Sequence, residues 1–253
     1  MTASSNRTAE NSVFENYGAR AVAEGLSYTS ISGRYKIQEE GVKRAVIDIV
    51  KKLELTPTDD LLDIGCGAGN ITIPLSFLVR STTCIDHEKV LELLQKRLPK
   101  DGLTLMAGSF FDVAVSRTFS KVLSYGVVLC LPSQKEVIAF VDKAASLVAP
   151  GGRLLIGDLP NADKKNRFSK SQAGKDFSAQ WEKLMENPDN QRELSWTKEN
   201  LKAGGETAFF DDNFVCELML RYRQQGFESY ILSQPSNLAF GNTREDLLLV
   251  RPA

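Results

Sequence analysis

The ten residues from 61 to 70, Leu-Leu-Asp-Ile-Gly-Cys-Gly-Ala-Gly-Asn, constrain the fold of this chain more than any other segment. A short apolar run leads directly into three glycines at alternate positions, Gly65, Gly67 and Gly69. A glycine loop after a strand lets a ligand approach the backbone at points where a Cβ would collide with it. The segment therefore predicts a ligand site at the carboxyl end of a strand, as is typical of open α/β sheets.

Strand-like and helical patterns alternate along most of the chain. Short apolar runs predict strands at residues 60–64, 81–86, 103–107, 121–131, 153–157, 227–232 and 246–250. Apolar residues at helical spacing predict helices at residues 38–53, 70–79, 89–98 and 135–148. A further helix is expected between Asn213, as its cap, and Gly226. Such alternation predicts an α/β fold in which helices cover both faces of a mostly parallel sheet.

Four segments are expected from these patterns. Residues 1–37 place aromatic side chains among polar ones and are expected to fold over a cleft as a lid. Residues 38–160 are expected to form the ligand-binding core. Residues 161–212 are polar, helix-prone in places, and too long for an ordinary αβ connection, so they predict a substrate-facing insertion. Residues 213–253 are expected to complete the sheet with one helix and two strands.

Composition narrows the classes of partner. The net charge of -1 and the pI near 6.0 give no field that would attract nucleic acid or an anionic membrane. Residues 1–10 lack the apolar centre of a signal peptide, and no apolar run approaches the roughly 20 residues of a membrane helix. The four cysteines form no C-x-x-C pair, which argues against a metal site and a disulfide framework. A cytoplasmic protein is expected.

Two acidic residues indicate the charge of the ligand. Asp63 lies two positions before the first glycine, where a carboxylate repels a pyrophosphate but favours ammonium and sulfonium groups. Asp86 ends the second predicted strand, 23 positions after Asp63. An acid about 20 residues beyond a glycine loop is placed to accept hydrogen bonds from the two hydroxyls of a ribose. Asp63 and the glycine spacing therefore favour a positively charged nucleoside over a dinucleotide.

These residues resemble the first motif of the class I S-adenosylmethionine-dependent methyltransferases, and the resemblance extends over about residues 40 to 160. Pro150-Gly151-Gly152 is similar to the turn before the family's fifth strand. The resemblance implies a Rossmann-like fold with a mostly parallel seven-stranded sheet, an N-terminal lid and an insertion after the fifth strand. It also implies an enzyme that uses S-adenosyl-L-methionine as cofactor.

The resemblance further implies which residues contact the cofactor. These are Asp63, Gly65, Cys66, Gly67, Gly69, Asp86, His87, Ser109, Phe110 and Ser124. Ser109 departs from the family, which usually has an Asp there to accept from the adenine amino group. A hydroxyl accepts that bond more weakly than a carboxylate does.

No histidine is placed to act as a general base, because the one histidine, His87, lies in the expected ribose-binding turn. Asp158, at the exit of the fifth predicted strand, and Tyr125 are therefore the candidate catalytic residues. Tyr35, Asn161 and Arg244 lie in segments expected to face the substrate.

The acceptor is expected to be a small hydroxylated molecule methylated at oxygen, such as a sugar or a related metabolite. A quinone or another apolar acceptor is a further alternative, although it would suit a more apolar insertion than this one. The alternatives are methylation at carbon or nitrogen, a dinucleotide-dependent oxidoreductase, and a protein that binds the cofactor without turnover.

Overall fold

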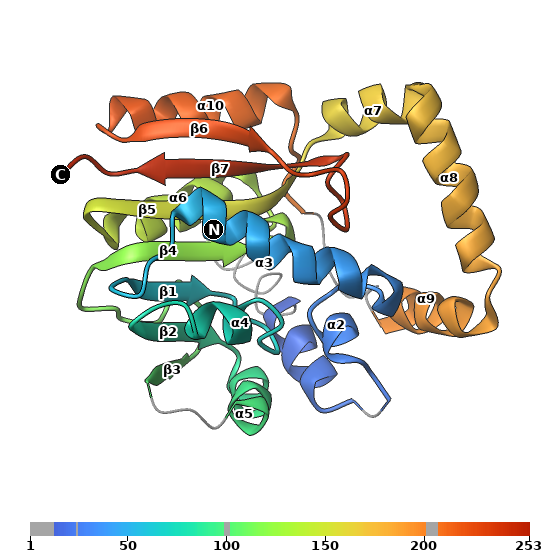
Figure 1. The fold of residues 1–253 in the computed structure, drawn as a ribbon, viewed down its shortest axis with the longest axis horizontal. Helices are drawn as coiled ribbons and strands as arrows, with labels where there is room; N and C mark the ends of the chain where they lie inside the picture. Colours follow the sequence, from blue (N-terminus) through green and yellow to red (C-terminus); the bar gives the residue numbers. More distant parts are fainter. Residues whose placement is uncertain (1–12, 24, 99–101, 201–206) are drawn as a thin grey trace, which may run out of the picture.

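The centre of the molecule is a seven-stranded sheet with the strand order β3-β2-β1-β4-β5-β7-β6 (Figure 1). The computed structural model describes residues 13–23, 25–98, 102–200 and 207–253, without the side chains of 196–200. The strands are β1 (Asp60–Ile64), β2 (Ser81–Asp86), β3 (Leu103–Ala107), β4 (Phe119–Tyr125), β5 (Val148–Pro160), β6 (Glu228–Ser233) and β7 (Arg244–Val250). Neighbouring strands pair in parallel from β3 to β5, whereas β7 runs antiparallel to both β5 and β6.

Helices cover both faces of this sheet because its buried side chains alternate between two apolar clusters. One cluster joins Leu61 and Leu123 to α3 (Glu39–Leu53) and α4 (Thr72–Ser76). The other joins Leu62 and Val122 to α6 (Gln134–Ser146) and α10 (Asp212–Gln224). A small cluster packs α5 (Glu88–Arg97) against Cys84. The predicted fold class is confirmed.

Several predicted boundaries are wrong for local reasons. The fourth strand ends at Tyr125, because Gly126 turns the chain with a φ of 74° and a short 3-10 turn, Val128–Cys130, follows. The fifth strand begins at Val148 and includes the Pro-Gly-Gly segment that was predicted to precede it. The pairing with β4 shifts its register at this segment, between Phe119 and Lys121. Asp211, and not Asn213, caps α10, since its carboxylate accepts a hydrogen bond from Phe214 N at 2.8 Å.

The two segments outside the core are more helical than their sequences predict. The N-terminal segment contains a helix at residues 13–21, α2 (Tyr28–Ile31) and a 3-10 turn, Lys36–Gln38. Residues 1–12 of the predicted lid and 201–206 of the predicted insertion lie outside the described residues. The insertion contains α7 (Ala162–Lys170), α8 (Gln172–Met185) and α9 (Pro188–Asn200), which arch away from the sheet and return toward α2 (Figure 1).

The arch starts and ends at one place beside the sheet. Asn161 caps α7 by accepting a hydrogen bond from Lys164 N at 3.0 Å, and its Nδ2 donates to Asp212 Oδ1 at 2.8 Å. Ala162 N donates to the carbonyl of Phe210 at 2.9 Å. At the far end of the arch, Glu193 of α9 accepts from Lys36 N at 3.0 Å. The insertion therefore contacts both the core and the N-terminal segment.

Within the described part of the chain, no helix combines the length and apolar character needed to cross a membrane.

Candidate active site

The glycine loop connects β1 to α4 and folds back against its neighbours. Gly65 and Gly69 have φ values of 77° and 85°, in the left-handed region that disfavours other residues. A Cβ on Gly65 would lie 2.4 Å from Val127 Cγ2, and one on Gly69 would lie 2.4 Å from Leu94 Cδ1. Glycine is thus required for this loop to pack closely while its backbone borders a cavity.

That cavity, of about 180 Å³, lies at the carboxyl ends of the parallel strands, where the strand order reverses between β1 and β4. The structure brings nine of the sequence-predicted site residues to its wall: Asp63, Gly65, Cys66, Gly67, Asp86, Ser109, Phe110, Tyr125 and Asp158. The N-terminal segment adds residues that were predicted only in general terms as a lid: Val13, Phe14, Tyr17, Ile31, Ser32 and Arg34. We call this space the first cavity.

Asp86 is held in a fixed orientation by the backbone around it. Its Oδ2 accepts from Gly67 N at 2.8 Å, and its Oδ1 accepts from His87 N at 2.7 Å. Burial raises the pKa of this carboxyl, and the two backbone hydrogen bonds oppose that shift. The loop and the acid predicted to act with it are therefore in direct contact.

Asp63 is 3 % exposed and lies beneath the loop. Its Oδ2 accepts a hydrogen bond from Thr72 Oγ1 at 2.6 Å. Burial raises the pKa of Asp63 to about 7, despite that hydrogen bond. The side chain is thus close to half ionised at neutral pH, and a bound cation would favour its charged form.

Three residues predicted to contact the cofactor lie outside the wall of the first cavity: Gly69, His87 and Ser124. His87 caps α5, since its Nδ1 accepts from Lys89 N at 3.2 Å. Its ring also packs against Phe14 with a centroid distance of 5.1 Å. His87 therefore supports the N-terminal helix against the turn between β2 and α5, outside the wall of the first cavity.

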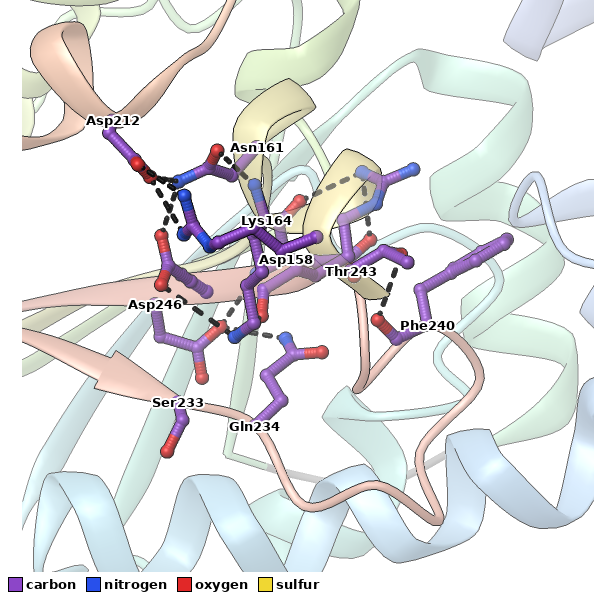
Figure 2. A network of polar contacts seen from close by, with 12 residues as sticks. Asp158, Asn161, Lys164, Asp212, Ser233, Gln234, Phe240, Thr243 and Asp246 are labelled. Atoms are coloured by element: carbon purple, nitrogen blue, oxygen red, sulfur yellow. Dashed lines mark hydrogen bonds and ion pairs between the residues drawn. The ribbon is translucent and has the colours of Figure 1, made fainter. Parts of the chain in front are cut away.

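A polar network occupies the carboxyl end of β5 (Figure 2). Asp158 has a φ of 64° and is 2 % exposed, and its carboxylate pairs with the guanidinium of Arg34. Its N donates to Asp246 Oδ1 at 2.8 Å, and its carbonyl accepts from Arg244 Nη1 at 3.0 Å. Gln234 Nε2 donates to Asp246 Oδ1 at 2.7 Å. Asp158 is thus fixed at both its backbone and its side chain.

Tyr125 joins this network through its hydroxyl, which accepts a hydrogen bond from Gln234 Nε2 at 3.1 Å. Burial and the charges of Asp158 and Asp246 raise the pKa of Tyr125 well above its ordinary value. The phenol therefore stays protonated near neutral pH and keeps a proton that it can donate in a hydrogen bond.

A second cavity, of about 680 Å³, lies between the insertion and the loop before β7. It shares Ala239 and Phe240 with the first cavity, and the predicted substrate residues Asn161 and Arg244 line it. Tyr35, the third, lines neither cavity but packs against Trp181 with a centroid distance of 6.0 Å. The predicted site residues are thus divided between two adjoining spaces.

Sequence reasoning missed the aromatic side chains of this second cavity. Phe168, Phe177 and Trp181 line it from α7 and α8. Phe177 and Trp181 are four positions apart, a spacing that places side chains on one face of a helix. That spacing was the available signal, but the polar composition of the insertion obscured it.

Comparison with known proteins places this geometry in context. Residues 61–152 match the family model described as a methyltransferase domain. The malonyl-[acyl-carrier protein] O-methyltransferase of Haemophilus ducreyi is 23% identical over 141 residues, which are 53% of this chain and 54% of that protein. The chain thus matches about half the length of this curated relative.

Solved structures show the same fold over nearly the whole chain. Phosphoethanolamine N-methyltransferase 1 of Haemonchus contortus, in complex with phosphoethanolamine and S-adenosylhomocysteine, has a TM-score of 0.65 at 17% identity. That alignment covers 100% of this chain and 50% of the other. Magnesium protoporphyrin IX methyltransferase of Synechocystis PCC 6803, with bound SAM, has a TM-score of 0.59 at 16% identity, covering 96% and 97%.

Proposed function

We propose that this chain, whose residues 61–152 form a methyltransferase domain within a class I methyltransferase fold, transfers a methyl group from S-adenosyl-L-methionine to a hydroxyl of a small molecule. The observation that carries the proposal is the contact between the glycine loop and Asp86 beside a buried acid, Asp63, at one cavity. This arrangement suits a nucleoside that also carries positive charge.

The residues of the first cavity fit this cofactor. Asp86 is oriented to accept from the ribose hydroxyls, and Asp63 to favour the ammonium group. The side chain of Asn70, at this wall, is oriented by Arg97, which donates to Asn70 Oδ1. Its Nδ2 is buried without a hydrogen-bond partner, so Asn70 has a free donor for a ligand. Ser109 and Phe110 line the part of the cavity next to β3, where the adenine is expected.

The N-terminal segment lines one side of the first cavity. Phe14 and Tyr17 line its wall, and Phe14 rests on His87. A dry, covered site strengthens the electrostatic contacts that align the reacting groups. This supports the role of residues 13–23 and 25–37 as the described part of the predicted lid.

The bound cofactor supplies an electrophilic methyl group on a sulfonium. With the cofactor bound, the methyl acceptor would take up this methyl group on its oxygen in exchange for the bond to sulfur, and its hydroxyl proton would pass to a carboxylate of the cavity. Three carboxylates line the first cavity among the residues described, and two of them lie at the glycine loop. Asp158 is therefore assigned as the base that takes this proton, and Tyr125 as a hydrogen-bond donor to the molecule that is methylated.

Asp158 is already paired with the guanidinium of Arg34, so its assistance in removing a proton is expected to be modest. This suits an acceptor whose hydroxyl is already acidic or sits close to the cationic groups. The sugar-like acceptor expected from the sequence lacks such an acidic hydroxyl and is the alternative.

Calorimetric titration of the full chain with S-adenosylmethionine, S-adenosylhomocysteine and NADH tests the cofactor. We expect micromolar binding of the first two ligands, loss of that binding in Asp86→Ala, and unchanged binding in Asp189→Ala, a highly exposed acid in α9. NADH binding without a response to either methionine nucleoside would replace the proposal with an oxidoreductase. Cofactor binding with no methyl transfer to any of a pool of hydroxylated, amine and carbon acceptors would indicate a protein that binds without turnover.

A further inference from the structure

The second cavity adjoins the place where methyl transfer is proposed. Phe240 lines both cavities, and the guanidinium carbons of Arg34 and Arg244 lie 5.0 Å and 4.9 Å from the centre of its ring. Arg34 belongs to the wall of the first cavity and Arg244 to that of the second. The second cavity therefore adjoins the first at Phe240, and a molecule bound there lies next to the space proposed for the cofactor.

The outer wall of the second cavity is aromatic. Phe177 stacks on Trp181 with a centroid distance of 6.3 Å and an interplanar angle of 17°, and Phe168 meets Phe177 edge-on at 5.9 Å. Phe177 and Phe209, which both line the cavity, remain 45% and 62% exposed. Large apolar rings that face a cavity and are left this exposed favour a ligand with a flat apolar surface.

The charge of the wall has one sign. Among its described residues, Lys165 and Arg244 are cationic and none is acidic. Lys164 and Glu245, which lie close by, form an ion pair with each other at 3.6 Å. Asp158 faces the first cavity, where its carboxylate pairs with Arg34 and also lies 3.6 Å from Arg244 Nη1, so Lys165 is the cation of this wall for which the described residues show no ion pair. The second cavity therefore favours a ligand that carries negative charge.

We infer that the acceptor is a hydroxylated aromatic molecule with an anionic group such as a carboxylate, bound in the second cavity. Its ring packs against Phe177 and Trp181, and its anionic group faces Lys165 and Arg244. This inference rests on the proposed methyl transfer and adds the class of the acceptor to it. A neutral sugar would use neither the charge nor much of the ring surface.

A set of four probes separates the two features of this ligand. Hydroxynaphthoate has both a ring and a negative charge, naphthol has the ring, glucuronate has the charge, and glucose has neither. Each is titrated by calorimetry into the full chain saturated with S-adenosylhomocysteine. We expect hydroxynaphthoate to bind at least about tenfold more tightly than any other probe, because two independent contacts add.

Matched variants locate the binding. Phe177→Ala is expected to weaken hydroxynaphthoate about fivefold, and Leu184→Ala, a similarly exposed residue of the same helix outside the cavity, to leave it unchanged. Lys165→Gln is expected to lower the affinity for hydroxynaphthoate about threefold and to leave the affinity for naphthol unchanged. Lys170→Gln, in the same helix, is expected to change neither affinity.

The outcomes separate this inference from the proposed function. If S-adenosylhomocysteine itself fails to bind, the proposed function is wrong. If it binds and hydroxynaphthoate does not, or if glucuronate or glucose binds more tightly than hydroxynaphthoate, the inference is wrong and the methyltransferase function stands. Equal weakening by Leu184→Ala and Phe177→Ala would also overturn it.

Discussion

The raised pKa of Asp63 makes cofactor affinity depend on pH in a way that one substitution can isolate. Asp63 is 3 % exposed and its pKa is about 7, so its ionised fraction rises about tenfold between pH 6 and pH 8. If the carboxylate stabilises the ammonium group of the cofactor, the dissociation constant should fall by nearly the same factor over that range. At higher pH affinity should fall again, once the amino group of the ligand loses its proton.

The assay is calorimetric titration of S-adenosylhomocysteine at half-unit steps from pH 6 to pH 9, on the wild-type chain and on Asp63→Asn. The amide keeps the shape of the side chain and can still accept from Thr72. We expect the variant to bind more weakly at pH 8 and to lose the rising part of the profile. A rise in the variant that is smaller than that of the wild-type chain would come from Asp86, whose pKa burial also raises.

The raised pKa of Asp63 also predicts the pH dependence of stability. The folded pKa lies above the ordinary value of 3.8, so ionisation of Asp63 destabilises the fold as the pH rises from about 4 to 7. The cost reaches at most about 4 kcal/mol above pH 7, because each pH unit between the unfolded and folded pKa values contributes about 1.36 kcal/mol. Asp63→Asn should therefore raise the melting temperature of the cofactor-free chain at pH 8 and change it little at pH 4. For the affinity profile, a wild-type affinity that is flat from pH 6 to pH 8, or a variant that keeps the full rise, would refute the role of Asp63 as the partner of the ammonium group.

Three other substitutions test separate parts of the structure. Gly67→Ala places a Cβ at a φ of 56°, so we expect loss of S-adenosylhomocysteine binding by calorimetry and a destabilisation of about 1–2 kcal/mol in urea. Tyr125→Phe removes a hydrogen-bond donor and should lower turnover about tenfold in a methyl-transfer assay while leaving cofactor affinity unchanged. Lys52→Met leaves the fully buried Asp246 without its cation and should cost about 3–5 kcal/mol in urea unfolding. The exposed Lys43→Met should cost less than about 1 kcal/mol, and equal losses would contradict the assigned role of Lys52.

The strands of the sheet and the family resemblance could be predicted from the sequence alone, and the domain match and the fold confirm them. Strands β1, β2 and β3 lie where their short apolar runs predict them. The boundaries that were wrong depend on single backbone features. The apolar residues after Gly126 resemble a continuing strand, although the positive φ of that glycine ends it.

The two cavities differ in how far sequence reasoning could reach them. The first is built around one loop and strand ends whose positions follow from the topology, so Asp63, Gly67 and Asp86 were predicted to act together. The second combines α7, α8 and the segments 207–210 and 238–244, whose mutual approach is set by packing over long sequence distances. Its aromatic and cationic character became visible only when those segments were placed side by side.

The joined ends of the arch have an evolutionary consequence. Because Asn161 contacts Asp212 and Ala162 N bonds to Phe210 O, the chain leaves the sheet and returns to it at nearly the same point. Selection can therefore lengthen, shorten or replace the segment of helices α7 to α9 as one unit without changing the register of the strands. In such an architecture the choice of methyl acceptor would be inherited separately from the capacity to bind the methyl donor.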